Sequence, residues 1–239
     1  MNVLVACEES QEVCMAFRAK GHIAFSCDIQ ECSGGHPEWH IQDDVLPLLS
    51  GHRLFWTMDG VEHDDVLNDF WDMIIAFPPC TDLAVSGARH FAKKREDGRQ
   101  RKAVEFFGKI LTAECGRVCV ENPVGIISGE YVWNWYPDLC LEYGLPAKPS
   151  QIVQPYQFGH PYRKTTCLFE RGLKPLVPTN IVKPGDVDEY GFPMNFATRM
   201  AIDENGKIIS WNDPRTAKMR SKTPRGLAEA MAEQWGGES

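Results

Sequence analysis

Short apolar runs alternate with amphipathic stretches along most of the chain. The runs are rich in valine, isoleucine and phenylalanine, as is typical of strands that are buried on both faces. Between the first two runs, Val13, Cys14 and Phe17 fall on one helical face, and residues 104–111 repeat the helical pattern. This alternation predicts an α/β fold, with a doubly wound, mostly parallel sheet of roughly six or seven strands and helices on both faces. The runs are residues 3–7, 23–27, 71–76, 118–120 and 166–169.

Helix boundaries are marked near both ends of the chain. Ser10 stands where it can cap the first helix, and Gly21 can end that helix. Thr223 is a suitable cap for a final helix, and Pro224 suits its first turn. We expect this last helix to continue to about Trp235.

The stretch 51–70 does not follow the alternation clearly. Its segment 53–57 could form an extra strand. The acidic residues at 63–65 are expected to begin a surface helix.

A second irregular stretch, residues 172–222, lacks long apolar runs and is rich in proline, glycine and aspartate. We expect it to form a small recognition or lid region at residues 172–218. The main domain would then consist of residues 1–171 and 219–239, within a length that suits one large α/β domain.

Polar groups follow several of the predicted strands at the point where each strand ends. Pro78 and Pro79 cannot donate ladder hydrogen bonds, so the strand stops there and Cys80 is held in a stiff loop. Glu121 and Asp28 follow two other strands. In open α/β sheets the carboxyl ends of the strands are where ligands bind. A free cysteine is more often a small buried hydrophobe, so the thiol alone does not establish catalysis.

Composition narrows the class of protein. The chain is 43% hydrophobic and 24% charged, and it contains no apolar run long enough for a membrane span. Its first residues enter a strand directly and lack the features of a signal peptide. Nine cysteines without a disulfide-like rhythm favour reduced thiols and a cytoplasmic protein.

The net charge of −8 gives no general affinity for nucleic acid, but one segment is strongly basic. It directly follows the Cys80 loop and has two interpretations: a solvated helix face, or a segment that contacts phosphates. Its cations are Arg89, Lys93, Lys94, Arg95, Arg99, Arg101 and Lys102.

In combination, the motifs around these residues resemble the DNA cytosine C5-methyltransferases, most closely a compact group encoded by phages and prophages. The resemblance covers roughly residues 1–175 and 219–236. It implies a class I, Rossmann-like, S-adenosylmethionine-dependent methyltransferase fold and a bacterial host cytoplasm. The motifs are Ala6-Cys7-Glu8, Ser26-Cys27-Asp28, Trp39-His40-Ile41-Gln42, Ala76-Phe77-Pro78-Pro79-Cys80-Thr81, Leu83-Ala84-Val85-Ser86-Gly87-Ala88-Arg89, Glu121-Asn122-Pro123, Gln154-Pro155-Tyr156-Gln157-Phe158-Gly159 and Ala228-Glu229-Ala230-Met231-Ala232-Glu233-Gln234-Trp235.

The same resemblance implies roles for individual residues. Cys80 would add to C6 of cytosine and Glu121 would act at N3, so that C5 can take the methyl group of S-adenosylmethionine. Asp28 would bind the ribose of the cofactor and Asp44 its adenine. The cofactor-binding set is Cys7, Glu8, Ser10, Asp28, Ile29, Asp44 and Pro78. The substrate-binding set is Thr81, Ser86, Arg89, Asn122, Arg163, Lys164 and Thr166.

The chain departs from this family in three places. Glycines of the first motif are replaced by Cys7, Glu9, Ser10 and Gln11. In the family's Gln-x-Arg-x-Arg motif, Lys164 matches the first arginine and Thr166 the second. The region available for target recognition is short, so sequence specificity in DNA should be short, loose or supplied by a protein partner.

Three other interpretations stay open. An enzyme of the same fold could modify a free pyrimidine nucleotide, or a silent phage protein could keep the fold for binding only. The spacing of four residues would also suit a zinc site, although such matches are often accidental. Those residues are Cys27, Cys32, His36 and His40.

Overall fold

The computed structural model describes residues 1–50, 54–58, 61–65, 71–185, 207, 209–210 and 213–237. Within these residues a mixed sheet of seven strands has the order β3-β2-β1-β6-β7-β9-β8. The strands are β1 Asn2–Ala6, β2 Ile23–Cys27, β3 His40–Ile41, β6 Met73–Ala76, β7 Val118–Pro123, β8 Gln151–Val153 and β9 Thr166–Arg171.

Strands β3, β2, β1, β6 and β7 are parallel, whereas β9 pairs antiparallel with both β7 and β8. Strand β2 lies on one side of β1, and β6 lies on its other side. The order of strands therefore reverses between β1 and β6, and in doubly wound sheets ligands bind at such a point. The predicted doubly wound, mostly parallel sheet is confirmed.

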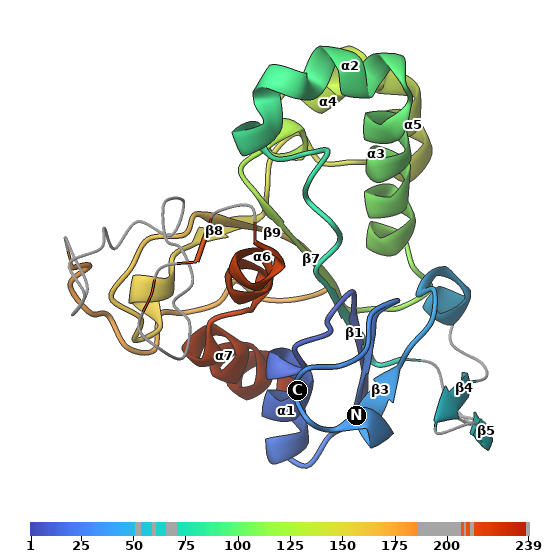
Figure 1. Cartoon of the computed structure of the whole chain (residues 1–239), viewed down its shortest axis with the longest axis vertical. Coiled ribbons are helices and arrows are strands. Elements are labelled where there is room, and N and C mark those ends of the chain that lie inside the picture. The colour runs from blue at the N-terminus through green and yellow to red at the C-terminus, as the bar shows by residue number, and fades with distance from the viewer. Residues whose placement is uncertain are drawn as a thin grey trace.

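Helices cover both faces of the sheet (Figure 1). Alternate residues of each central strand face opposite sides, so Val3 and Ile75 pack against α1 and α7, while Leu4 and Ile74 pack toward α3 and α5. The helices are α1 Glu12–Ala19, α2 Phe91–Glu96, α3 Arg99–Leu111, α4 Tyr131–Trp135, α5 Pro137–Tyr143, α6 Pro214–Ser221 and α7 Arg225–Gly236. Short 3-10 turns are η1 Pro37–Trp39, η2 Leu46–Ser50, η3 Val85–His90, η4 Ile126–Ser128 and η5 Pro155–Gln157.

The first helix is capped differently from the prediction. Gln11, not Ser10, occupies the cap position, and its side chain does not cap the helix. The buried Glu8 carboxylate instead accepts hydrogen bonds from the backbone N–H groups of Val13, at 2.7 Å, and Cys14, at 3.1 Å. The expected Ser10 cap is therefore wrong, because a carboxylate at the end of β1 already satisfies the orphan donors of the first turn.

Strand β7 extends further than its apolar pattern indicated. It continues through Glu121 and Asn122 to Pro123, because β9 pairs with it antiparallel over this whole length. Glu121 lies opposite Leu168 in this ladder. The carboxyl is therefore held by a strand and not by a loop.

The stretch after η2 forms a separate two-stranded sheet, in which β4 Leu54–Met58 pairs antiparallel with β5 Val61–Asp65. The extra strand expected at 53–57 is confirmed as β4. The surface helix expected to begin at His63-Asp64-Asp65 is wrong, because these residues lie in β5 and pair with β4. Residues 66–70 lie outside the described residues.

Much of the expected lid region, including 186–206, lies outside the described residues. Its described part contains one helix that the sequence did not predict, α6, which runs across the boundary placed between residues 218 and 219. The division of the chain into a main domain and a lid stays a prediction. Among the described helices, none combines the length and the apolar content needed to cross a membrane.

Candidate active site

The Cys80 thiol lies in a tight turn directly after β6. The backbone N–H of Phe77 donates the last bond to β1, at 2.9 Å from the Ala6 carbonyl oxygen. Pro78 is buried behind the turn. The carbonyl oxygen of Cys80 then accepts from the backbone N–H groups of Leu83 and Ala84, at 3.0 and 2.9 Å. The thiol is therefore held at the carboxyl edge of the sheet, where the sequence predicted a stiff loop.

Side chains from α2 and α3 form hydrogen bonds with the backbone that follows Cys80. The Lys94 ammonium donates to the Thr81 carbonyl oxygen and lies 3.2 Å from an Asp82 carboxylate oxygen. The Gln100 amide donates to the Asp82 carbonyl oxygen at 2.9 Å and accepts from the Tyr136 hydroxyl at 3.1 Å. The pattern of apolar residues gave no indication that Lys94, Gln100 and Tyr136 would make these four contacts. They restrict the movement of the Cys80 loop.

The Cys80 loop also runs against the segment that follows Glu121. Val85 donates to the Val124 carbonyl oxygen at 3.0 Å, and Ile126 donates to the Leu83 carbonyl oxygen at 2.9 Å. A Cβ atom on Gly125 would lie 2.3 Å from that same Leu83 oxygen, so only glycine allows this approach. The two candidate catalytic loops are thus joined by backbone contacts.

The pKa values of the Cys80 thiol and the Glu121 carboxyl are both raised, and the charge of Glu121 contributes to the shift at Cys80. Burial raises the pKa of the thiol, the charge of Glu121 raises it further, and Lys164 and Arg220 act in the opposite direction. Burial also raises the pKa of Glu121, against the effect of Lys164. A carboxyl whose proton is held more tightly than usual can donate a hydrogen bond to a ring nitrogen.

The cations beside this pair come from two distant segments. Lys164 is anchored by its backbone N–H to the Gln154 side chain, and its ammonium donates to the Arg220 carbonyl oxygen at 3.1 Å. Arg163 is exposed, and Thr166 is buried with its hydroxyl donating to the Lys164 carbonyl oxygen at 3.1 Å. Of the predicted motif residues, Lys164 is therefore the cation that acts on both Cys80 and Glu121.

Arg220, from α6, is a site residue that the sequence did not reveal. The local signal was only a cluster of basic residues between 215 and 222. Such clusters usually belong to solvated helix faces, and no motif connected this one to Cys80.

The other predicted substrate residues are placed in different surroundings. Thr81, Ser86 and Arg89 are exposed on the loop and on η3, and Arg89 donates to His90 at 2.9 Å. Asn122 is only 1% exposed. Neither its amide nitrogen nor its amide oxygen has a hydrogen-bond partner among the described residues.

Several cations of the basic segment interact with other groups of the protein. Lys94, expected among its exposed cations, is 5% exposed because it anchors the Cys80 loop. Arg95 lies 4.1 Å above the Trp135 ring, Arg99 pairs with Asp97, and Arg101 pairs with Asp138. Of the seven cations only Lys94 is buried, and the other six are exposed.

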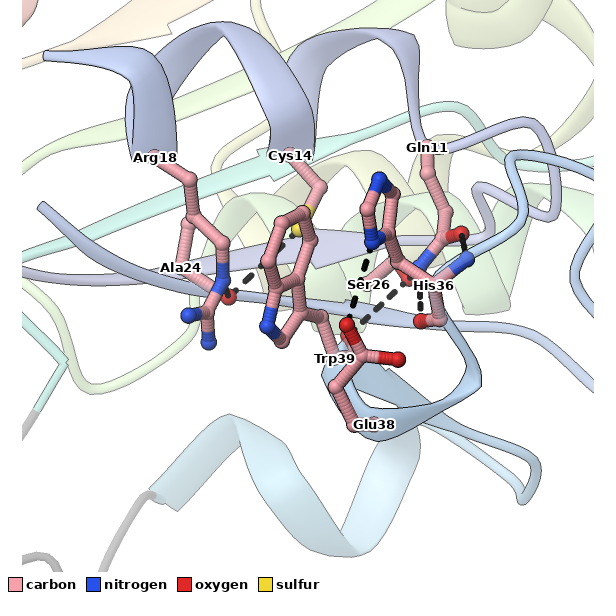
Figure 2. Close-up of polar contacts among 8 residues, drawn as sticks. All are labelled: Gln11, Cys14, Arg18, Ala24, Ser26, His36, Glu38 and Trp39. Carbon is pink, nitrogen blue, oxygen red and sulfur yellow. Dashed lines mark hydrogen bonds and ion pairs between the residues drawn. The ribbon is translucent and has the colours of Figure 1, made fainter.

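Two residues in the turn after β1 adopt the left-handed backbone conformation that is usual for glycine, although neither is glycine. Cys7 and Gln11 have φ values of 58° and 59°, in the left-handed region that glycine adopts most easily. Gln11 is held there by its side chain, which donates to the Ser26 hydroxyl and to the His36 carbonyl oxygen, at 3.3 and 2.8 Å (Figure 2). The backbone N–H of His36 donates back to the Gln11 amide oxygen at 3.1 Å.

A loop covers this turn closely. The backbone N–H of Ser33 donates to the Glu9 carbonyl oxygen at 2.7 Å, and a Cβ atom on Gly34 would lie 2.6 Å from that of Gln11. Ser10 is buried beneath the loop, and the Glu8 carboxylate faces α1. Glu8, expected to bind a cofactor, therefore has its carboxylate engaged in capping a helix.

Three predicted cofactor residues lie near Cys7. Burial raises the pKa of the Cys7 thiol, and the charges of Asp28 and Asp44 raise it further. Ile29, next to Asp28 in the chain, is 76% exposed. An exposed apolar side chain next to a carboxylate suits a ligand that carries an aromatic ring and hydroxyl groups.

Three of the four residues with zinc-like spacing, Cys27, His36 and His40, have other contacts. The two ring nitrogens of His40 lie 2.8 Å from the Ser26 hydroxyl and 2.9 Å from the Gln30 carbonyl oxygen. His36 stacks on Trp39, with ring centroids 3.8 Å apart, and its Nδ1 lies 3.0 Å from Glu38 (Figure 2). In the part of the chain that the structure describes, no three His, Cys, Asp or Glu side chains are grouped as metal ligands.

A surface groove of about 730 Å³ lies between α1 and α7, away from Cys80. Its walls carry the ion pairs Lys20–Glu233 and Arg225–Glu229. Such exposed pairs are typical of a solvated surface.

No protein-family model and no curated protein sequence matches the chain. Among solved structures it is similar to a prophage-encoded protein of E. coli assigned as a DNA modification methyltransferase, with 16% identity, a TM-score of 0.47 and coverage of 77% of this chain and 52% of that one. It is also similar to the methyltransferase EhMeth of Entamoeba histolytica, with 13% identity, a TM-score of 0.44 and coverage of 77% and 57%. The Dnmt2 methyltransferase of S. pombe shares 12% identity, with a TM-score of 0.37 and coverage of 80% and 54%. The chain thus spans somewhat more than half the length of these proteins.

Proposed function

We propose that the protein transfers a methyl group from S-adenosylmethionine to C5 of cytosine in DNA. The observation that carries this proposal is that Cys80 and Glu121 follow the paired strand segments of β6 and β7 at one edge of the sheet, where Ala76 lies opposite Val120, with Lys164 acting on both. A thiol and a tightly held carboxyl proton in one place are the two groups that activation of a pyrimidine ring requires.

The reaction begins when the Cys80 thiolate forms a bond to C6 of the ring. The electron pair of the C5–C6 double bond moves toward N3, which takes the proton of Glu121, and the ring becomes an enamine. S-adenosylmethionine would supply the methyl group: as C5 bonds to it, the bond from that methyl group to the cofactor sulfur breaks and S-adenosylhomocysteine leaves. A base then takes the C5 proton, the electron pair of the C5–H bond forms the C5–C6 double bond again, and the bond between C6 and the Cys80 sulfur breaks to free the thiolate. Glu121 takes its proton back from N3, so that neutral 5-methylcytosine is released.

The residues around Cys7 fit the cofactor. The left-handed backbone at Cys7 and Gln11 preserves the tight turn that glycines would otherwise provide. Asp28 would accept hydrogen bonds from the ribose hydroxyls and Asp44 from the adenine amine, with Ile29 against the ring. Pro78 would complete the wall beside the transferred methyl group.

DNA as the substrate is supported by the exposed polar and basic residues around the thiol. Thr81, Ser86, Arg89 and Arg163 are exposed and would contact the nucleic acid. A base in duplex DNA must leave the stack to reach Cys80. The short region at 172–218 favours loose sequence specificity or a protein partner that supplies it.

The proposal is tested by mass spectrometry of nucleosides from cytosine-containing DNA that has been incubated with the protein and S-adenosylmethionine. We expect 5-methylcytosine with the wild type and none with Cys80→Ala, since the nucleophile is lost. 5-fluorocytosine DNA should trap the wild type covalently, because fluorine cannot leave C5 as a proton does. Methylation of a free cytidine nucleotide but not of DNA would favour the nucleotide enzyme. Failure with all these substrates would favour the silent binding protein.

A further inference from the structure

Helix α7 begins against a histidine from a distant loop. The backbone N–H of Gly226, in the first turn of the helix, donates to Nε2 of His160 at 2.9 Å. Pro224 occupies the cap position, and its side chain has no group that could accept this hydrogen bond. Since the first N–H groups of a helix lack partners within it, His160 supplies an acceptor that the local sequence does not.

The backbone of the same loop packs closely on the start of α7. A Cβ atom on Gly226 would overlap the Phe158 carbonyl oxygen and would lie 3.4 Å from His160 Nε2, so only glycine allows this approach. The His160 backbone N–H donates to the Pro155 carbonyl oxygen at 3.1 Å, and the Tyr162 ring lies 5.9 Å from the imidazole, measured between centroids. The imidazole is therefore held at the helix from both its backbone and its ring.

The loop that contains His160 also carries Lys164. Near the start of this loop, the Gln154 side chain accepts from the Lys164 backbone N–H at 3.1 Å and donates to the Thr165 hydroxyl at 2.8 Å. Residues 154–165 are thus closed into one hydrogen-bonded loop. The bond from Gly226 to His160 joins this loop to α7.

Only the neutral imidazole can make this bond. An unprotonated ring nitrogen accepts a hydrogen bond, whereas both nitrogens of the imidazolium ion are donors. Protonation of His160 would place a donor against the Gly226 N–H and a positive charge at the positive end of the helix dipole. Burial lowers the pKa of His160, which agrees with a site that disfavours the charged ring.

The other charged groups around His160 come from α7 and α1. Glu229 and Glu12 raise the pKa of His160, against the larger effect of burial. Each of these carboxylates has a cation of its own, since Arg225 lies 2.9 Å from Glu229 and Lys222 lies 3.9 Å from Glu12. Burial therefore determines the direction of the shift.

We propose that the hydrogen bond between Gly226 and His160 is a pH-sensitive joint, which holds the 154–165 loop on α7 in neutral solution and releases it in mild acid. The folded protein binds the His160 proton less tightly than the unfolded chain, so the stabilisation is complete above about pH 6.5 and is lost as the pH falls below that value. Release would also loosen Lys164, the cation that acts on Cys80 and Glu121. That consequence for methyl transfer rests on the proposed function.

The joint is tested by hydrogen exchange of the whole protein at several pH values between about 7.5 and about 5, corrected for the intrinsic effect of pH. Mass spectrometry follows the peptides that cover residues 154–165 and the first turn of α7. In the wild type we expect both to exchange about tenfold faster in acid, as for the loss of one hydrogen bond. Unchanged exchange in the wild type overturns the proposal.

Three variants show whether His160 is responsible. His160→Gln, whose side-chain oxygen can replace Nε2 and does not titrate, should keep slow exchange at every pH. His160→Phe, which has no acceptor, should exchange fast throughout. His22→Gln is the matched control, because burial also lowers the pKa of His22, which lies at the opposite end of α7 beside Gly236. It should respond to acid as the wild type does. The wild-type response in His160→Gln would overturn the proposal.

Histidine NMR of the wild type gives a test that requires no variant to fold. At about pH 7.5 the His160 ring should carry its proton on Nδ1, and it should titrate below the ordinary histidine value of 6.5. A proton on Nε2, or titration at or above that value, overturns the joint. Should the protein methylate no cytosine, the proposed function fails, while exchange and titration still decide whether the joint exists.

Discussion

Asn122 is a buried amide beside the candidate acid Glu121, and its polar atoms lack partners among the described residues. An unsatisfied buried polar group destabilises a protein by about 1–3 kcal/mol. The hydrogen-bonded pairing of β7 with β9 holds Asn122 in this buried position. Such a group is often kept because a ligand uses it.

Replacing Asn122 with leucine, a side chain of similar shape, should therefore stabilise the protein while it reduces methyl transfer. We expect the free energy of unfolding to increase by about 1 kcal/mol, measured by urea denaturation. Asn134→Leu, at an exposed position in α4, is the control and should not stabilise the protein. A destabilised Asn122→Leu would mean that the amide has a partner that stabilises the fold.

Glu170, in β9, provides a prediction about pH. Burial raises the pKa of its carboxyl from 4.5 to about 7. The folded protein then holds this proton more tightly than the unfolded chain, so the contribution to stability is complete below pH 4.5 and decreases as the pH rises to about 7. Because the group is partly exposed, the loss should be on the order of 1–2 kcal/mol.

Glu170→Gln should remove this dependence, since an amide does not titrate. Urea unfolding of the variant at several pH values should give a flatter stability profile than the wild type across this window. The exposed Glu142→Gln should keep the wild-type slope. If Glu170→Gln also keeps that slope, another group is responsible for it.

At the scale of elements, α2 acts as a support for the Cys80 loop through Lys94. Lys94→Met would leave the Asp82 carboxylate without its buried cation, which typically destabilises a protein by about 3 kcal/mol. We expect a lower thermal midpoint and faster alkylation of Cys80, because the loop is released. Lys93→Met, the exposed neighbour on the same helix, should change neither quantity.

The same helices limit which cations can contact DNA. Since Lys94 and Arg101 are engaged within the protein, the exposed Lys93 and Lys102 are the better candidates for phosphate contacts. Replacing both with alanine should reduce the slope of log K against log salt by roughly 1.8, or about 0.9 for each phosphate lost. The measurement is fluorescence anisotropy with labelled DNA, and Lys148→Ala is the control. An unchanged slope would identify the segment as a solvated helix face.

At the scale of the whole molecule, parallel pairing places the ends of β1, β2, β6 and β7 at one edge. Cys7, Asp28, Cys80 and Glu121 therefore share that edge although they are far apart in sequence. The two cores on either side of the sheet hold this arrangement rigid. A ligand bound across the edge should stabilise the entire fold.

S-adenosylmethionine should accordingly raise the thermal midpoint of the wild type, with binding measured by calorimetry. Asp28→Ala should weaken that binding by at least about tenfold, because a hydrogen bond to a carboxylate is lost. The exposed Glu31→Ala should bind as the wild type does. Equal affinity in both variants would remove Asp28 from the cofactor site.

The sequence by itself determined strands β1, β2, β6, β7 and β9 and the polar groups that follow them, but not the short strands β3 and β8. β2 has the predicted limits, and Cys80 follows β6 in a loop stiffened by proline, because apolar runs and proline act through the local backbone. The extension of β7, the burial of Lys94 and the hydrogen bond from Lys164 to the end of α6 were decided only by the tertiary structure. Each depends on a partner far away in the chain: β9 for Glu121, Asp82 for Lys94, and Lys164 for the end of α6. The periodicity of apolar residues indicates which face of a helix or strand is buried, but it does not indicate which distant residue packs against that face.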